Sequence, residues 1–259
     1  MSALGGSKPF QALVLAGSRG GIDPVADYAG VSQKGLIVLG GQTLLTRVLG
    51  ALDAAGATRI GVSTNDKALE TALATETTRA TLLPLPSAAG PSQSVHQAAD
   101  LMGTPLLVTT VDHALLEPEW ITDFMVDTPD GADIAILLAE EAVVRAAAPT
   151  TRRTYLAFRD GRYSGCNLFY LKTPASLGAI DLWRKVEQHR KQPWKIAALL
   201  GPMILVRYLL GRMTLDETVG RIGALAGVKA VAVRARDGLA AVDVDKPTDL
   251  DLVRGIVEG

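Results

Sequence analysis

The chain has 259 residues and a net charge of −1, from 26 Lys and Arg against 27 Asp and Glu. Its 48% hydrophobic and 20% charged content is ordinary for a globular protein and argues against disorder, and the near-neutral balance gives no general attraction for nucleic acid. A single cysteine, Cys166, excludes an intrachain disulfide and a cysteine-rich zinc module.

The order of predicted elements indicates a parallel sheet. Short apolar runs predict strands at residues 11–16, 59–63, 80–85, 105–110 and 133–139, and helical spacing predicts helices at 43–55, 66–74, 92–102 and 117–126. Strands that alternate with helices are typical of βαβ units, in which ligands gather at the carboxyl ends of the strands. This part of the chain therefore predicts an α/β fold.

The pattern changes after about residue 149. Strands are expected at 155–159 and 165–171, followed by a mostly helical stretch over 182–222, strands at 228–233 and 240–244, and a helix at 248–257. We expect one Rossmann-like, three-layer α/β domain over residues 8–259, with a mainly parallel central sheet and a helical insertion, in which residues 150–225 form an acceptor-side β/helical insertion.

The first motif runs from Leu15 to Gly21 and is followed by Lys34. A strand that opens into glycines and a serine lets backbone N–H groups approach a phosphate, and Arg19 adds a charge. The spacing fits neither G-x-G-x-x-G nor G-x-x-x-x-G-K-[ST], so the dinucleotide and P-loop motifs are excluded. The alternative is a βα turn whose glycines only avoid strain.

Two acidic motifs lie further along the chain. Asp112 follows the most apolar predicted strand, where a carboxylate can hold Mg²⁺ against substrate phosphates, although an aspartate there can also simply cap a turn. Asp243 and Asp245 would share one face of the predicted strand at 240–244, so either can supply a second carboxylate. Thr248 is the expected N-cap of the last helix.

The ordered set LVLAGSRGG, QKGLIVLGGQTLLTRVL, GPSQSVHQA, LLVTTVDHALL, GCNLFYL and AAVDVDKPTDL resembles the nucleotidyltransferases of the glycosyltransferase-A-like fold. Within them it is most similar to the molybdenum-cofactor guanylyltransferase-like (NTP transferase) group. The resemblance implies that a substrate phosphate attacks the α-phosphate of an NTP, releasing pyrophosphate. It covers residues 11–145, 163–172 and 240–257.

The resemblance also implies roles for individual residues. Arg19, Lys34 and Asp112 would be catalytic, and Asp112 and Asp245 would bind Mg²⁺, with Asp243 as the alternative to Asp245. The nucleotide-binding set would be Leu15, Ala16, Gly17, Ser18, Arg19, Gly20, Lys34, Ser94 and Asp112. Ser18 replaces a glycine of the usual loop, which leaves CTP and GTP both open, and cytidylyl transfer is favoured on general resemblance.

The segment 150–225 should decide the acceptor, because it is rich in Lys and Arg. A phosphorylated acceptor needs such charges, although a solvated helix face would show them too. We assign Arg153 and Lys195 to the acceptor phosphate and Asn167 to an acceptor hydroxyl. His113 is expected to be packed or solvated, and Cys166 to be a packed residue and not a nucleophile.

Two other functions remain open at this point. The first is a glycosyltransferase using a nucleotide-sugar, although no D-x-D follows the central strand, and the second is an inactive nucleotide-binding protein. A cytoplasmic protein without a transmembrane segment is expected, since residues 1–10 lack a signal core and the most apolar stretch, 196–210, is too short to span a bilayer. Residues 194–213 should form a helix broken near Gly201-Pro202, serving as core, as a homodimer interface or as a surface for peripheral membrane contact.

Overall fold

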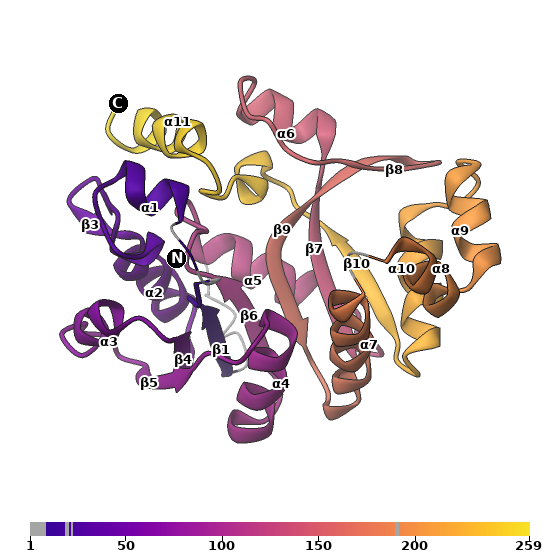
Figure 1. Cartoon of the computed structure of the whole chain (residues 1–259), viewed down its shortest axis with the longest axis horizontal. Coiled ribbons are helices and arrows are strands. Elements are labelled where there is room, and N and C mark those ends of the chain that lie inside the picture. Colours follow the sequence, from indigo (N-terminus) through magenta and orange to yellow (C-terminus); the bar gives the residue numbers. More distant parts are fainter. Residues whose placement is uncertain (1–8, 19–20, 22, 190–191) are drawn as a thin grey trace, which may run out of the picture.

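The computed structural model describes residues 9–18, 21, 23–189 and 192–259. Its centre is an eight-stranded sheet with the order β10-β7-β9-β6-β1-β4-β5, and β8 pairs with β9 beside this path (Figure 1). The strands are β1 (Phe10–Leu15), β4 (Ala57–Thr64), β5 (Thr81–Pro86), β6 (Leu106–Thr110), β7 (Ile134–Glu140), β8 (Leu156–Phe158), β9 (Gly161–Leu171) and β10 (Ala230–Arg234). A small second sheet pairs β2 (Val38–Leu39) with β3 (Gln42–Thr43).

The main sheet is mostly parallel, as predicted. β1 runs parallel to β4 and β6, β4 to β5, and β7 to β10. Only β9, with its partners β6, β7 and β8, forms antiparallel pairs in this sheet among the residues described. Parallel strands need helical crossovers, which explains why helices cover both faces.

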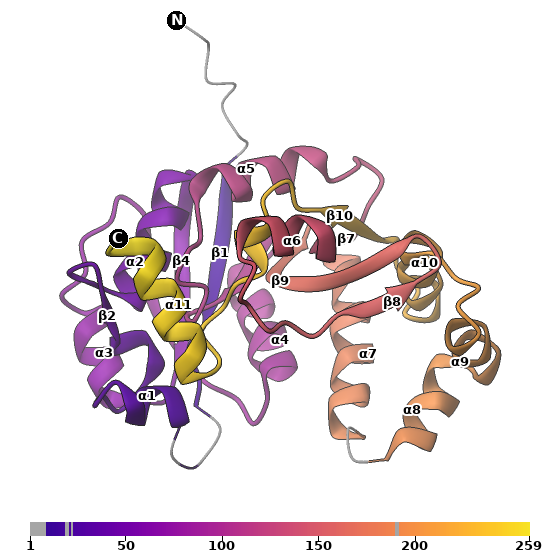
Figure 2. The same cartoon turned by 90° about the horizontal axis from the view of Figure 1, so that it is seen from above.

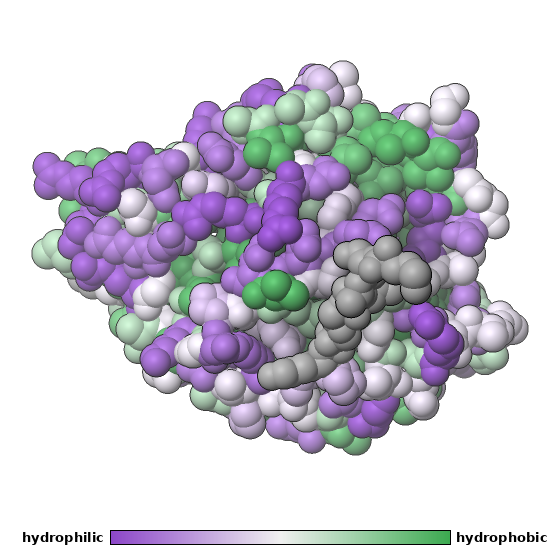
Figure 3. Space-filling view, turned by 180° about the vertical axis from the view of Figure 1, so that it is seen from behind, coloured by the Kyte–Doolittle hydropathy of each residue, from purple (hydrophilic) through white to green (hydrophobic). Residues whose placement is uncertain are grey.

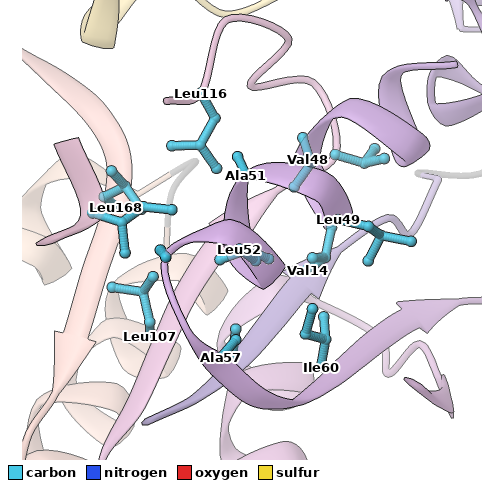
Figure 4. Close-up of a cluster of buried hydrophobic side chains, with 14 of the residues drawn as sticks. Val14, Val48, Leu49, Ala51, Leu52, Ala57, Ile60, Leu107, Leu116 and Leu168 are labelled. Carbon is cyan, nitrogen blue, oxygen red and sulfur yellow. The ribbon is translucent and has the colours of Figure 1, made fainter. Parts of the chain in front are cut away.

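The helices form two outer layers (Figure 2). Side chains alternate along β1, so Ala12 and Val14 face α2 (Leu44–Ala54) and α5 (Pro118–Asp127) in one hydrophobic core, while Leu13 faces α4 (Pro91–Met102) and α7 (Leu177–Gln188) in another. Figure 4 shows Val48, Leu49 and Leu52 of α2 in one buried cluster with Val14, Ile60 and Leu107 of the sheet. The period of two along the strand thus builds the three layers predicted.

The remaining helices are short or peripheral. They are α1 (Pro24–Tyr28), α3 (Lys67–Leu73), α6 (Glu141–Ala147), α8 (Pro193–Leu200), α9 (Pro202–Leu209), α10 (Leu215–Leu225) and α11 (Pro247–Val257), with 3-10 turns at Lys34–Leu36, Pro174–Ser176 and Gly238–Ala241. Seen from behind, hydrophilic residues predominate at the end carrying α8–α10, and hydrophobic residues gather toward the end carrying α11 (Figure 3). No helix of the described residues is long and apolar enough to cross a membrane.

Two local predictions are wrong. Residues 240–244 do not form a strand, because a 3-10 turn at Gly238–Ala241 is capped by the Asp237 side chain, which accepts the Leu239 N–H at 2.9 Å. Thr248 is not an N-cap, because α11 begins one residue earlier, at Pro247, and Lys246 is its N-cap. Proline suits the first helical position since its missing N–H has no partner there in any case.

The segment 150–225 supplies β8, β9 and α7–α10. β9 lies between β6 and β7, so this segment contributes a strand to the central sheet as well as helices. The predicted break is confirmed at Gly201, whose φ of +88° lies in a region that favours glycine, and Pro202 begins the next helix.

Candidate functional site

The carboxyl ends of β1 and β6 bring distant sequence motifs together. The chain leaves β1 toward β4 on one side and returns through β6 on the other, which makes a topological switch point between β1 and β6. Gly17 lies just beyond β1 and Asp112 just beyond β6. The Val111 N–H donates to the Leu15 carbonyl at 3.0 Å, so the two strand ends are tied together.

Lys34 is the centre of the polar cluster at this edge. Its Nζ lies 3.0 Å from Asp112 Oδ2 and 3.0 Å from Asp245 Oδ1, and it donates to the Val244 carbonyl at 3.2 Å. Asp23, the N-cap of α1, contributes a fourth oxygen 4.0 Å away. Three of the predicted site residues therefore meet at one ammonium group.

Gln33, which the sequence analysis did not single out, fixes the Lys34 turn. It is buried, its side-chain amide donates to the Ala16 carbonyl at 2.8 Å, and its side-chain oxygen accepts the Gly35 N–H. A Cβ on Gly35 would lie 2.8 Å from Leu69 Cδ1 and 2.9 Å from Val111 Cγ2, so only glycine fits. Its position directly before Lys34 was the only signal for Gln33 in the sequence.

The charges in the cluster depend on one another. Burial by itself would lower the pKa of Lys34, but the carboxylates of Asp112 and Asp245 outweigh burial and raise it above its ordinary value. Burial raises the pKa of the Asp112 carboxyl, and the Lys34 ammonium opposes that rise. The ammonium therefore stays charged at neutral pH and balances the carboxylates beside it.

Asp245 is held in place through its backbone. The buried carboxylate of Asp249, in the first turn of α11, accepts the N–H groups of Asp245 and Lys246 at 3.2 and 2.9 Å. The Val244 N–H donates to the Asp112 carbonyl at 3.0 Å. These contacts align the start of α11 with the end of β6.

Asp243 belongs to a different network from Asp245. Its carboxylate forms an ion pair with Arg153 and accepts a hydrogen bond from Asn167 Nδ2 at 2.6 Å. The side chains of Arg153 and Asp243 are only 11% and 8% exposed. Asn167 has a φ of +50°, a left-handed conformation that a non-glycine residue adopts at a cost. Asp243 thus holds two of the predicted acceptor residues, while Asp245 faces Lys34.

Polar atoms without an ordinary hydrogen bond border the same region. Among the described residues, nine buried side-chain polar atoms lack a hydrogen bond of ordinary geometry, and two of them, Asp181 Oδ1 and Asp243 Oδ1, are in ion pairs instead. Six lie in two short segments, 110–113 and 151–155: Thr110 Oγ1, Asp112 Oδ1, His113 Nε2, Thr151 Oγ1, Arg153 Nε and the Tyr155 hydroxyl. Thr151 and Tyr155 were not predicted from the sequence.

Two residues with reactive side chains are packed and not exposed. His113 is buried against Trp120, with ring centroids 6.2 Å apart, and burial lowers its pKa from 6.5 to about 4. Cys166 is also buried, and burial raises the pKa of its thiol to about 12. A neutral imidazole and a protonated thiol in these positions fit the expectation that they are packing residues.

The loop after β1 offers backbone groups. Gly17 and Ser18 are exposed, whereas Leu15 is half-buried and Ala16 is buried. A Cβ on Gly17 would lie 2.6 Å from Ser87 Oγ, so the loops after β1 and β5 approach closely there. Arg19 and Gly20, which were predicted to bind nucleotide, lie outside the described residues.

Ser94 and Lys195 lie apart from the Lys34 cluster. The Ser94 hydroxyl is buried in α4 and accepts the Ala88 N–H at 2.9 Å, so it shapes the loop that leads from β5 to α4. Lys195 is exposed on α8, at the end of the molecule opposite α1 and α11 (Figure 1). The structure does not bring Lys195 to Arg153 or Asn167.

The carboxylates of Asp112 and Asp245 suit a divalent cation whose remaining ligands come from a substrate. No group of three or more His, Cys, Asp or Glu side chains arranged for a metal occurs in the described part of the chain. Asp112 and Asp245 nevertheless both contact the Lys34 ammonium, and Asp112 Oδ1 has no hydrogen bond of ordinary geometry. Mg²⁺ commonly takes one or two carboxylates plus substrate phosphates, so these residues fit it.

The carboxylates around Lys34 outnumber its one ammonium group, so the cluster can hold an anionic substrate together with a cation. A fixed ammonium, two carboxylates and open backbone groups converge at the sheet edge, while the nearby imidazole is buried and neutral. That combination is typical of sites where positioning and electrostatics carry the reaction.

Comparisons with known proteins agree on one family. A family model described as a MobA-like NTP transferase domain matches residues 12–198, which is more than half of the chain. A structure described as a hypothetical transferase from Thermus thermophilus is 31% identical, with a TM-score of 0.79, covering 94% of this chain and 100% of that one. No curated protein sequence gives a significant match.

Two more distant structures share the fold. A nucleotidyl transferase from Methanothermobacter thermautotrophicus is 18% identical with a TM-score of 0.58, covering 97% of this chain and 99% of that one. A CMP:2-keto-3-deoxy-manno-octonic acid synthetase complexed with CTP is 14% identical with a TM-score of 0.58, covering 96% of this chain and 98% of that one. The expected glycosyltransferase-A-like, three-layer domain is confirmed.

Proposed function

Because this chain belongs to the MobA-like NTP transferase domain family and is a nucleotidyltransferase, we propose that it transfers CMP or GMP from an NTP to a small phosphorylated acceptor. An acceptor phosphate oxygen attacks the α-phosphorus, the bond from that phosphorus to the bridging oxygen breaks, and pyrophosphate leaves with the electron pair. The products are a nucleoside-diphosphate-linked acceptor and pyrophosphate.

One observation carries this proposal. Lys34, Asp112 and Asp245 come from distant parts of the chain, yet both carboxylates lie 3.0 Å from the same ammonium at the topological switch point. Ligands of open α/β sheets bind at such a point. A cation-centred carboxylate pair beside a glycine loop suits a triphosphate and its metal.

The proposed reaction needs little proton transfer by the protein. A phosphate monoester is already largely ionised near pH 7, so its oxygen can attack without a general base. Lys34 would supply positive charge to the phosphates, and the N–H groups of Gly17 and Ser18, in the exposed loop after β1, would approach them. This fits a site whose one nearby imidazole, His113, is neutral and buried.

Asp112 and Asp245 are the residues that would hold Mg²⁺. The bound metal would supply charge neutralisation on the triphosphate as it reacts. Lys34, which balances the same carboxylates in this structure, would then direct its ammonium toward phosphate oxygens. Gln33 and Gly35 keep the backbone of this turn fixed in either case.

The acceptor side is assigned to Arg153 and Asn167. Arg153 is tied to Asp243 through Nη1, while its buried Nε has no hydrogen bond of ordinary geometry among the described residues. Asn167 donates its amide N–H to Asp243, which leaves its amide oxygen as an acceptor for a substrate hydroxyl. Arg153 would bind the acceptor phosphate, and Asn167 an acceptor hydroxyl.

The choice of base is the part of this proposal that rests on family resemblance alone. We favour CTP on that general resemblance, with GTP as the alternative, because Ser18 in place of the usual glycine leaves both bases open. A thermal-shift screen of the four NTPs, each with and without Mg²⁺, ranks them directly, since a ligand stabilises by RT ln(1 + [L]/Kd).

Pyrophosphate release tests the reaction. The protein is incubated with Mg²⁺, each NTP and a set of phosphorylated alcohols and sugars, beside an Asp112→Asn variant and an Asp66→Asn control in the N-cap of α3. We expect release with one NTP, abolished by Asp112→Asn and retained by Asp66→Asn. Stabilisation by a UDP-sugar without any response to free NTPs, or no NTP binding at all, would contradict the proposal.

A further inference from the structure

We propose that α8 and α9 form a docking surface for an anionic membrane. The surface, termed here the apolar arm, comprises residues 193–212. It goes beyond the nucleotidyltransferase reaction, and its test does not depend on activity.

The arm exposes apolar side chains that a packed helix would bury. Trp194 on α8 is 67% exposed, and the others with large exposed surface are Met203, Leu205, Val206, Leu209 and Leu210. Met203, Val206 and Leu210 follow each other at spacings of three and four, so they lie on one face of α9. Burial of such a face against an apolar phase is favourable.

The side of α9 that carries Tyr208 packs against the protein, and Arg207 at the margin of the apolar face is paired. The Tyr208 ring packs against Phe158 of β8, with centroids 5.6 Å apart, and Arg207 pairs with Glu217 of α10 at 2.9 Å. These contacts set the rotation of the helix. The contacts of Tyr208 and Arg207 therefore hold α9 with its apolar face turned away from the rest of the protein.

The charge of the segment points to an anionic occupant. Residues 188–215 contain no Asp or Glu but include Arg190, Lys191, Lys195, Arg207 and Arg212, in a chain whose overall net charge is −1. Lys195 and Arg212 are exposed beside the apolar residues, and neither has an ion pair among the described residues. Basic residues at the rim of an apolar surface bind anionic headgroups while the apolar side chains enter the boundary.

The same charge argues against a second copy of this chain. A two-fold dimer brings the same patch from both subunits together, so this face would set basic residues against basic residues. An anionic lipid surface would instead attract the basic residues of the arm and cover its apolar side chains. Each helix is far too short to cross a bilayer, so the contact would be interfacial.

The position of the apolar arm relates it to the candidate site. α8 and α1 project from the same edge of the molecule in Figure 2, at its two ends. Asp23, the N-cap of α1, lies 4.0 Å from Lys34, so a membrane bound to the arm would lie along the edge that also carries the candidate site. The inference requires only binding, whatever the acceptor is.

Vesicle co-sedimentation tests the proposal on the full chain. Vesicles of phosphatidylcholine with about 30% phosphatidylglycerol are compared with phosphatidylcholine alone, at low salt and at about 0.5 M NaCl. We expect binding to the anionic vesicles only, weakened by salt. Val206→Glu/Leu209→Glu should lower the bound fraction at least about tenfold, and Lys195→Ala and Arg212→Ala about fivefold each.

A matched control separates the arm from general surface hydrophobicity. Leu101→Glu/Val126→Glu changes two exposed residues of α4 and α5, 63% and 77% exposed, and should bind vesicles like the wild type. Circular dichroism and sedimentation velocity confirm the fold and the oligomeric state of each variant. The inference is overturned if the wild type fails to bind anionic vesicles, if both double variants bind equally, or if Val206→Glu/Leu209→Glu only converts a dimer to monomers.

Discussion

Removing the Asp243 carboxylate should destabilise the fold more than any surface charge does. Asp243→Ala leaves the Arg153 guanidinium without its partner in a site where the two side chains are 11% and 8% exposed, and it also removes the acceptor of the Asn167 amide. Breaking a buried ion pair by removing one partner costs about 3–5 kcal/mol. We therefore expect the free energy of unfolding to fall by about 3–5 kcal/mol, a large part of the total for a domain.

The measurement is urea unfolding followed by circular dichroism, with an exposed pair as control. Asp127 pairs with Arg236 at 2.8 Å, but their side chains are 34% and 63% exposed, so Asp127→Ala should cost about 1 kcal/mol at most. The slope of the transition should be the same in all variants. A change in slope would mean that the denatured state had changed instead.

A double variant keeps the argument testable if Asp243→Ala does not fold. Arg153→Met/Asp243→Leu replaces both charges with apolar groups, and such replacements of buried pairs are often neutral or stabilising. We expect this variant to fold, with a loss of about 1–3 kcal/mol from the unpaired Asn167 amide, and to lose acceptor affinity, seen as a raised KM for the acceptor with an unchanged KM for the NTP. A loss below about 1 kcal/mol for Asp243→Ala would refute the assignment of a buried, energetically coupled pair.

Three further predictions concern the nucleotide side and the core. Lys34→Met should slow pyrophosphate release by about 10²–10³-fold, as expected for loss of one electrostatic contact, whereas Lys67→Met in the first turn of α3 should have no effect. His113 is protonated below pH 6.5 when unfolded but only below about 4 when folded, so the unfolded state binds more protons in that window and stability falls with pH. Between pH 7 and pH 4.5 this should cost about 2–3 kcal/mol in urea unfolding, and His113→Phe should lose less over the same range. Gly17→Ala places a Cβ 2.6 Å from Ser87 Oγ and should raise the KM for the NTP about tenfold, and Gly17→Ala/Ser87→Gly should recover most of that loss; an equal loss in both variants would show that the crowding is not the cause.

Much of the architecture follows from local sequence patterns. The apolar runs that predicted strands at 11–16, 59–63 and 105–110 correspond to β1, β4 and β6, and the helical spacing after Thr43 corresponds to α2. Such patterns are reliable because strand and helix periods differ, and each buries a face against the same sheet. The closeness of the glycine loop and Asp112 could be expected for the same reason, since carboxyl ends of parallel strands share one edge, whereas the role of Lys34 was implied only by the family resemblance.

Where a residue lies outside a regular element, periodicity makes no prediction about its direction. Asp243 and Asp245 were expected to share a face of a strand, but the 3-10 turn before them removes the period of two, and one carboxylate contacts Arg153 while the other contacts Lys34. The basic composition of 150–225 likewise could not show that Arg153 is buried near the site while Lys195 lies on α8. Their separation depends on how the segment packs.

The chain's sequence therefore determined the succession of strands and helices along residues 11–139, the break at Gly201-Pro202 and the pairing of a glycine loop with an acidic strand end. Each depends on backbone preference or on repeating burial, which neighbouring residues alone can set. Only the tertiary structure decided which carboxylate faces the ammonium, which arginine is buried, and that α9 turns its apolar face outward. Those outcomes depend on contacts between residues far apart in the chain, such as Tyr208 with Phe158, and no local sequence pattern predicts them.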